Sequence, residues 1–241
     1  MMICFSMKFE FDEIKWGISK RKDGSMKVIF DGLPDRDALA NRKKFFSALG
    51  VDHKNVVSAD LIHGNRVAIV ASADGGRLIP DTDALVTNKP GVYLTVTGAD
   101  CVPVFFYDPK QKAIGLAHAG WRGVVKNIAA EAVCAMKEKY GSMPSDICAL
   151  IGPRIQAHHL EVHEDVAERF SGHPDRVQKR DGHIFIDLGR IIFDQLLDAG
   201  VLKTNIANDP ACTYCEKENY FSFRRDKPNK LQAMVAYIGR R

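Results

Sequence analysis

The sequence lacks the features that mark several broad classes of protein. No apolar run approaches the roughly 18 to 20 residues that a membrane-spanning helix needs, because the longest one, Val92–Tyr107, is broken by Gly98 and Asp100. The 19 glycines and 10 prolines show no period, which excludes a collagen-like or low-complexity chain. Hydrophobic residues make up 46% of the 241 residues, too large a share for a mainly disordered chain. We therefore expect a globular protein with no membrane partner.

Cysteines are few and irregularly spaced. The six cysteines form no disulfide framework, and a chain of this length does not need one. Residues 1–10 contain no basic segment and too short an apolar stretch for a signal peptide, and Met7 is an alternative start. These features predict a cytoplasmic protein with reduced thiols.

Neither sign of charge dominates, and several common enzyme motifs are missing. The 34 Lys and Arg residues against 30 Asp and Glu leave a net charge of +4, spread along the chain rather than gathered in one stripe. This distribution argues against a nucleic-acid partner but is compatible with an anionic small molecule. The absence of Gly-x-Ser-x-Gly, phosphate-loop and Gly-x-Gly-x-x-Gly motifs argues against the corresponding serine hydrolases, P-loop enzymes and Rossmann dehydrogenases.

Helix and strand patterns alternate along the chain. Apolar periodicity, caps and terminal glycines predict helices from Asp35 to Gly50, from Gly123 to Gly141 and from Asp187 to Gly200, with a shorter one over Glu164–Phe170. Apolar, β-branched and aromatic segments predict nine strands. They are Lys27–Phe30, Val67–Val70, Ala84–Val86, Val92–Thr97, Val102–Tyr107, Ala113–Ala117, Ile147–Ile151, His183–Ile186 and Met234–Ile238. Because several are joined by short turns, we predict an α+β layered architecture in one domain, residues 1–241, with 1–16 as a peripheral segment.

Three potential metal ligands stand near the ends of predicted strands. Cys101 directly precedes one strand and His118 directly follows the next, so a hairpin through Asp108–Lys110 would bring them together at its open end. His63 lies in a turn before another strand. One thiolate and two imidazoles suit zinc and leave a fourth position for water or substrate. The alternative is structural, because buried cysteines and strand-end histidines are common.

Other motifs are compatible with anion or metal binding, each beside a simpler interpretation. Gly120–Gly123 opens a helix and offers free N–H groups next to Arg122. Arg224 and Arg225 can clamp phosphate, or they can form a solvated surface pair. Cys212 and Cys215 form a Cys-x-x-Cys that is half of a zinc site, a redox pair or a structural feature, and we favour the last. His158-His159 and His163, which lie near Glu161 and Glu164 in the sequence, match no zinc signature, so we interpret them as exposed.

Taken in order, four segments resemble the YfiH-type family. They are Leu61–Gly64, Thr82–Thr87, Thr97–Val104 and Ala117–Gly123, and the similarity continues through Phe221–Asp226. Members of that family carry the labels laccase-domain protein, purine nucleoside phosphorylase or peptidoglycan editing factor. The resemblance implies a zinc site made by His63, Cys101 and His118. It also implies a layered α/β sandwich related to cytotoxic necrotizing factor catalytic domains.

The resemblance further implies activity on purine nucleosides. The expected reactions are phosphorolysis of adenosine, inosine and methylthioadenosine, and deamination of adenosine. In this scheme Asp100 and Asp83 are candidates for proton transfer, and Arg122, Arg224 and Arg225 would hold phosphate. Two departures bear on substrate preference. Leu61-Ile62 stands where the family usually has Gln before Val-His-Gly, and Lys227–Lys230 stands where Thr-Gly-Arg is common.

Three other functions remain open at this stage. A copper-dependent polyphenol oxidase would need a trinuclear cluster built from His-x-His pairs, which are absent. An amide hydrolase acting on a peptidoglycan precursor would use Cys101 as nucleophile and His118 as base. A non-enzymatic module would bind a nucleotide or a protein partner through Arg122 and Arg224-Arg225. We expect a monomer in each case.

Overall fold

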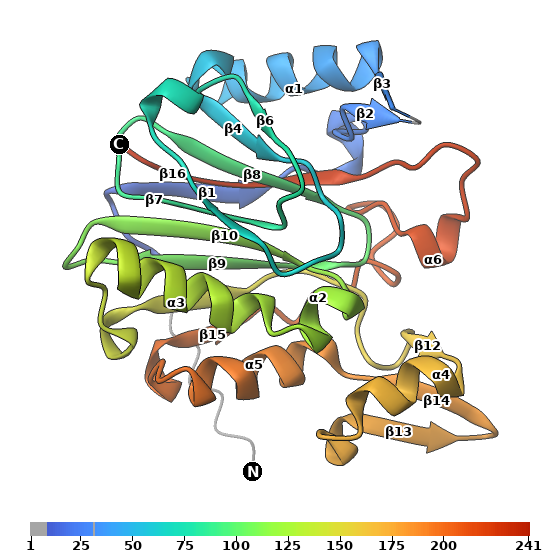
Figure 1. The fold of residues 1–241 in the computed structure, drawn as a ribbon. Helices are drawn as coiled ribbons and strands as arrows, with labels where there is room; N and C mark the ends of the chain where they lie inside the picture. The colour runs from blue at the N-terminus through green and yellow to red at the C-terminus, as the bar shows by residue number, and fades with distance from the viewer. Residues whose placement is uncertain (1–8, 31) are drawn as a thin grey trace.

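Two β-sheets stacked face to face form the centre of the molecule (Figure 1). The computed structural model describes residues 9–30 and 32–241, so the alternative start at Met7 lies outside the described residues. The first sheet has the order β1 (Ile14–Ile18), β16 (Met234–Arg240), β8 (Tyr93–Gly98), β4 (Val56–Ala59) and β6 (Leu78–Ile79). The second has the order β15 (Ile206–Asn208), β11 (Cys148–Ile151), β9 (Val102–Asp108), β10 (Ala113–Ala119), β7 (Ala84–Thr87) and β5 (Val67–Ile69).

Helices cover the outer face of each sheet (Figure 1). Helix α1 (Arg36–Ala48) packs on the first sheet, and α3 (Ile128–Tyr140) and α5 (Leu188–Asp198) pack on the second. A small sheet of β12 (Glu161–Val162), β14 (His183–Ile186) and β13 (Val177–Arg180) lies beside α4 (Glu164–Ala167). A two-stranded hairpin of β2 (Ile29–Phe30) and β3 (Leu33–Pro34) precedes α1. The predicted layered α/β sandwich is confirmed.

The side chains of β9 show how the layers are held. Val104 and Phe106 pack with the helices α3 and α5, whereas Phe105 and Tyr107 pack between the two sheets. Successive side chains of a strand point to opposite faces, so a strand buried on both faces is apolar throughout. This explains why the sequence of β9 shows no polar alternation.

The predicted helix boundaries are mostly confirmed. Asp35 caps α1 by accepting the backbone N–H of Asp37 and Ala38, and Asp187 caps α5 through the N–H of Arg190. The single helix predicted from Gly123 to Gly141 is wrong, because it is divided into α2 (Trp121–Val125) and α3. Asn127, with a φ of 60°, adopts the left-handed conformation that ends α2 and starts α3.

All nine predicted strands overlap observed ones, and the hairpin of β9 and β10 is confirmed. Its register pairs Ala119 with Val102 and Ala113 with Asp108. The carboxylate of Asp108 accepts the N–H of Lys110 and Gln111 and so closes the turn. In the part of 1–16 that is described, Phe9 and Ile14 are buried between the sheets.

None of the helices in residues 9–30 and 32–241 has both the length and the apolar character that crossing a bilayer requires.

Candidate metal centre

The open end of the β9–β10 hairpin brings the three predicted ligands together. The ligand atoms of His63, Cys101 and His118 all lie within 4.8 Å of one another. His118 sits in β10 opposite Pro103, Cys101 directly precedes β9, and His63 comes from the loop between β4 and β5. The two imidazole rings are nearly perpendicular, with centroids 4.9 Å apart. His118 is buried, Cys101 is half-buried and His63 is exposed, so the cluster is reached from the His63 side.

The buried carboxylate of Asp83 orients two of these ligands. Its Oδ1 lies 3.0 Å from Nδ1 of His118, which leaves Nε2 of that ring for a metal. The same carboxylate accepts the backbone N–H groups of Ile62, His63 and Gly64 at 3.3, 3.0 and 2.7 Å. A carboxylate behind a histidine is the usual partner that fixes the ring of a metal ligand. Asp83 therefore sets both the ring of His118 and the loop that carries His63.

The carboxylate of Asp100 has a different set of partners. It accepts the hydroxyl of Thr213 at 2.7 Å, the hydroxyl of Ser222 at 3.0 Å and the backbone N–H of Arg224 at 2.8 Å. Asp100 also adopts a φ of +90°, which is unusual for a residue other than glycine. These bonds hold Asp100, and with it the adjacent Cys101, against the C-terminal part of the chain.

The titration of the cluster favours a thiolate. Burial raises the pKa of Cys101, but the neighbouring His118 and His63 rings more than offset this effect and lower the pKa to about 6. Burial lowers the pKa of His118, whereas Cys101 and Asp83 together raise it to about 9. Burial raises the pKa of Asp83, and the bonds from His118 and the backbone more than offset this, so that its pKa is lowered. A metal ion bound by these ligands would take the place of the protons that the thiol and the imidazole otherwise carry.

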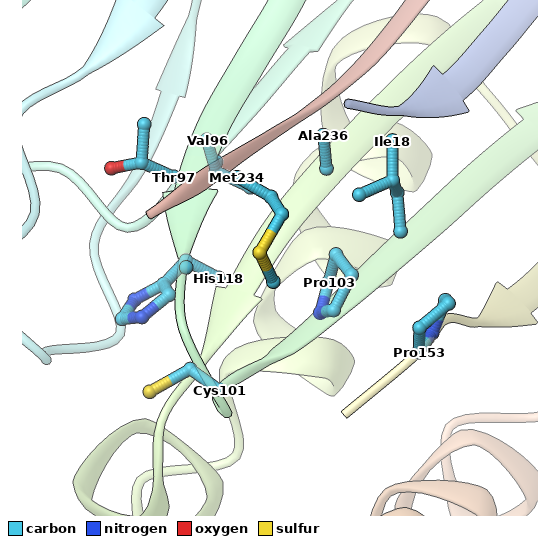
Figure 2. A pocket seen from close by; sticks show the side chains of 10 residues that line it. Ile18, Val96, Thr97, Cys101, Pro103, His118, Pro153, Met234 and Ala236 are labelled. Atoms are coloured by element: carbon cyan, nitrogen blue, oxygen red, sulfur yellow. The ribbon is translucent and has the colours of Figure 1, made fainter. Parts of the chain in front are cut away.

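A cleft of about 280 Å³ opens on the cluster. All three ligands line it, together with the apolar side chain of Phe223, which is 56% exposed, and with Lys27. A second cavity of about 20 Å³ lies behind Cys101 and His118, room for about one water molecule. Figure 2 shows its wall, in which Met234 and Pro103 lie beside these two ligands. The larger cleft is therefore the space available to a substrate.

The three predicted phosphate-binding arginines have unequal surroundings. All five N–H groups of Arg225 are used, because they bond to the carbonyls of Thr213, Tyr214 and Tyr220 and to both carboxylate oxygens of Asp226. Arg224 is exposed and donates to the carbonyl of Glu161. The guanidinium of Arg122 is also exposed and lies 4.2 Å from the ring centre of Trp121. Arg122 and Arg224 are therefore the two with an exposed guanidinium, and neither lines the cleft.

Gly120 and Phe223 have roles that the sequence did not predict. A Cβ on Gly120 would lie 2.9 Å from Cδ2 of His63 and 3.2 Å from Sγ of Cys101. The glycine next to His118 thus makes room for the other two ligands rather than only opening a helix. Phe223 precedes Arg224 in the segment Phe221–Asp226, which resembles the family. This position was the only feature of the sequence that pointed to Phe223 as a site residue.

The chain is therefore an α/β sandwich protein with two stacked sheets and a His-Cys-His cluster at the open end of a hairpin. Residues 16–241 match the family described as "Multi-copper polyphenol oxidoreductase laccase". The chain belongs to this family. It is 35% identical over 247 residues to "Purine nucleoside phosphorylase YlmD" of Bacillus subtilis, covering 94% of this chain and 88% of that protein.

Solved structures agree with this assignment. The structure of YlmD from Geobacillus stearothermophilus matches with a TM-score of 0.90 and 30% identity, covering 96% of this chain and 93% of that chain. The structure of YfiH from Bacillus licheniformis also gives a TM-score of 0.90, with 29% identity, covering 96% of this chain and 94% of that chain.

The family description names copper, so the potential metal ligands of this chain can be compared with those that a copper site needs. Within the described residues, groups of three or more potential ligands are His63 with Cys101 and His118, and His158 with Cys212 and Cys215. Neither has the many paired histidines of a trinuclear copper cluster. A blue-copper site usually adds a weak methionine ligand. Met234 lies nearby, but its sulfur accepts the N–H of Phe221 at 3.1 Å. The first cluster therefore lacks the donors of a laccase-type copper assembly and has a donor set for a single metal ion.

Proposed function

We propose that this chain is a zinc-dependent purine nucleoside phosphorylase that converts adenosine, inosine or methylthioadenosine to the free base and ribose 1-phosphate. The observation that carries the proposal is the His63–Cys101–His118 cluster at the base of a cleft with an exposed aromatic wall. The cleft volume is close to the lower end of the range for small-molecule sites. The names of the relatives support the same reaction. We infer a monomer that needs no nucleic acid or membrane.

The chain's own residues would perform distinct tasks in this reaction. His63, Cys101 and His118 would hold zinc, which when bound supplies a Lewis acid. Phosphorolysis joins a phosphate oxygen to C1′ of the ribose and breaks the bond from C1′ to the purine, which leaves with the electron pair and takes up a proton. Arg122, Arg224 and Lys27 supply positive charge for phosphate, and Phe223 offers a face for the purine.

We also propose adenosine deamination as a second activity of the same site. Three protein ligands leave a position for water, as in catalytic zinc sites. The two carboxylates predicted to transfer the proton are enclosed, Asp83 behind His118 and Asp100 behind the backbone at Cys101. We therefore propose that Asp83 and Asp100 act mainly by positioning the metal ligands His118 and Cys101.

The direct test is to measure metal and products on the same sample. Purified protein is analysed for zinc and then incubated with adenosine and phosphate, and the products are identified by mass. Adenine with ribose 1-phosphate supports phosphorolysis, and inosine supports deamination. A zinc-loaded protein that makes neither overturns the proposed function. A His118→Ala protein that loses the zinc of the His63–Cys101–His118 cluster but keeps either activity would show that the two reactions do not share this site.

Alkylation distinguishes two interpretations of Cys101, as a zinc ligand or as a catalytic nucleophile. We expect Cys101 to react with iodoacetamide in chelator-treated protein and to be protected when zinc is restored, because a zinc-bound thiolate is a poor nucleophile. Peptide mass mapping measures both states. Cys134, which is exposed and outside both clusters, should react equally in each state. Rapid alkylation of Cys101 in the zinc-loaded protein would favour the amide hydrolase instead.

Gly120→Ala should weaken zinc binding about 10-fold to 100-fold, the size of effect seen when the surroundings of a metal ligand are disturbed. The added Cβ would meet His63 and Cys101, so at least one ligand must move. A competition titration with a chromogenic chelator measures the affinity. Gly172→Ala is the matched control, because nothing lies within 4 Å of its added Cβ. Unchanged affinity in Gly120→Ala would contradict this geometry.

Phe223→Ala should raise the KM for adenosine about 10-fold, because stacking a base on an aromatic ring is worth about 1–3 kcal/mol. Phe223→Trp should keep the KM near that of the parent. Steady-state kinetics at saturating phosphate provides the measurement, and Leu202→Ala, another exposed apolar side chain, is the control. Equal KM values for Phe223→Ala and the parent would remove Phe223 from the substrate site.

A further inference from the structure

A second group of metal-ligating side chains lies outside the site described above. The ligand atoms of His158, Cys212 and Cys215 are all within 4.8 Å of one another, and Nε2 of His158 is 3.3 Å from Sγ of Cys215. His158 belongs to the loop between β11 and β12, and the cysteines belong to the loop between β15 and α6 (Phe223–Asp226). The sequence interpretation of His158 as an exposed residue without metal partners is thus incomplete, because folding brings the cysteines to it.

The backbone around the two cysteines is fixed by hydrogen bonds that do not involve their sulfur atoms. Arg154 and Cys212 form a parallel bridge, in which the N–H of Thr213 donates to the carbonyl of Arg154 at 2.9 Å. Arg225 donates to the carbonyls of Thr213 and Tyr214, both at 2.7 Å. These bonds set the course of the loop that carries the two sulfur atoms.

The surroundings of the ligands are those of a built site. Cys212 is 5% exposed, and its sulfur accepts the backbone N–H of Gln156 at 3.5 Å. The carbonyl of His158 accepts Nη2 of Arg180 at 2.8 Å. The ring of His159 stacks on Tyr214, with centroids 4.0 Å apart, and also contacts the ring of His158 at 4.5 Å. Such outer contacts restrict metal ligands to one geometry.

We propose that His158, Cys212 and Cys215 form a second zinc site. Zinc–sulfur and zinc–nitrogen distances of about 2.3 and 2.05 Å in a tetrahedron place sulfur and nitrogen about 3.6 Å apart. The observed 3.3 Å between His158 and Cys215 is close to that value. Two thiolates select a soft or borderline cation over magnesium or calcium. Water would take the fourth position.

This second zinc ion would brace the first site. Thr213 follows the ligand Cys212, and its hydroxyl bonds to Asp100, which precedes the first-site ligand Cys101. An ion that joins the Cys212–Cys215 loop to His158 therefore restrains the residue that holds Asp100. Its role is structural, since His158, Cys212 and Cys215 do not line the cleft.

The zinc content of the full chain, purified under reducing conditions, tests the proposal. We expect about two equivalents in the parent and about one in Cys215→Ser and in His158→Gln, two substitutions at exposed side chains. Cys134→Ser and His173→Ala are the controls and should keep about two. Cys215→Ser and His158→Gln proteins that keep the parent's zinc content, whether that is one equivalent or two, overturn the proposal. So does a Cys212–Cys215 disulfide that forms again soon after the reductant is removed, which would identify a redox pair.

A variant of the first site, His118→Ala, tests the second site separately. It shows whether a loss of zinc comes from misfolding, and its result does not depend on the proposed function. His118→Ala should retain about one equivalent, held by the second site, whatever its activity. After a chelator has removed its zinc, cobalt added to His118→Ala should give the strong ultraviolet absorption of thiolate ligation, and this absorption should be lost in the double variant that also carries Cys215→Ser. A His118→Ala protein that folds but binds no cobalt overturns the second site, whereas absent nucleoside turnover would bear only on the first.

Discussion

Replacing Asp83 by alanine is expected to abolish zinc binding at the first site and to lower the free energy of unfolding by about 3–5 kcal/mol. Asp83 is fully buried and accepts four hydrogen bonds, one from His118 and three from the backbone at Ile62, His63 and Gly64. Its removal leaves buried donors without an acceptor, which is among the costlier single changes. Chemical denaturation and zinc analysis measure the two effects.

The isosteric variant separates charge from packing. Asp83→Asn keeps the volume and one carbonyl oxygen, so we expect a smaller loss of stability and a zinc affinity 10-fold to 100-fold below that of the parent. Asp81→Asn, at an exposed carboxylate two residues away, is the control. Because the pKa of Asp83 is lowered, its contribution is present at neutral pH and is lost only as the pH falls below about 4. An Asp83→Ala protein with parental stability and zinc would refute this account.

Gly189→Ala is expected to destabilise the protein by about 3 kcal/mol, although alanine favours helices by about 1 kcal/mol over glycine. The added Cβ would overlap the guanidinium of Arg154, since the distance between them would be too short for any real contact. Arg154 is 2% exposed and donates to the carbonyls of Gly152 and Asp209, so it cannot swing into solvent without leaving buried groups unpaired.

Thermal unfolding measures this effect, with an expected fall in Tm of about 10 °C. Gly172→Ala, whose added Cβ meets nothing, should unfold close to the parent. A Gly189→Ala protein more stable than the parent would mean that Arg154 repacks freely. Since Arg154 pairs with Cys212 in the backbone bridge, zinc at the second site should also weaken in this variant.

Local signals in the sequence determined much of the fold. Asp35 and Asp187 predicted the starts of α1 and α5 because a cap acts on the N–H groups two or three residues away. Asp108 and the flanking apolar runs predicted the hairpin of β9 and β10, and with it the proximity of Cys101 and His118. The break between α2 and α3 escaped prediction, because the left-handed Asn127 interrupts an apolar periodicity that continues across it.

Only the tertiary structure decided what the polar side chains do. From the sequence, Asp83, Asp100 and Arg225 were all available for chemistry, whereas the fold surrounds each with hydrogen-bond partners, and those of Asp83 and Asp100 are distant in the chain. In the same way His158 and Cys215 are separated by 57 positions yet lie 3.3 Å apart. Residue type and local spacing determined which ligands the protein has. The packing of loops against the sheets decided which ones meet, because side-chain bonds between distant segments depend on the whole chain's path.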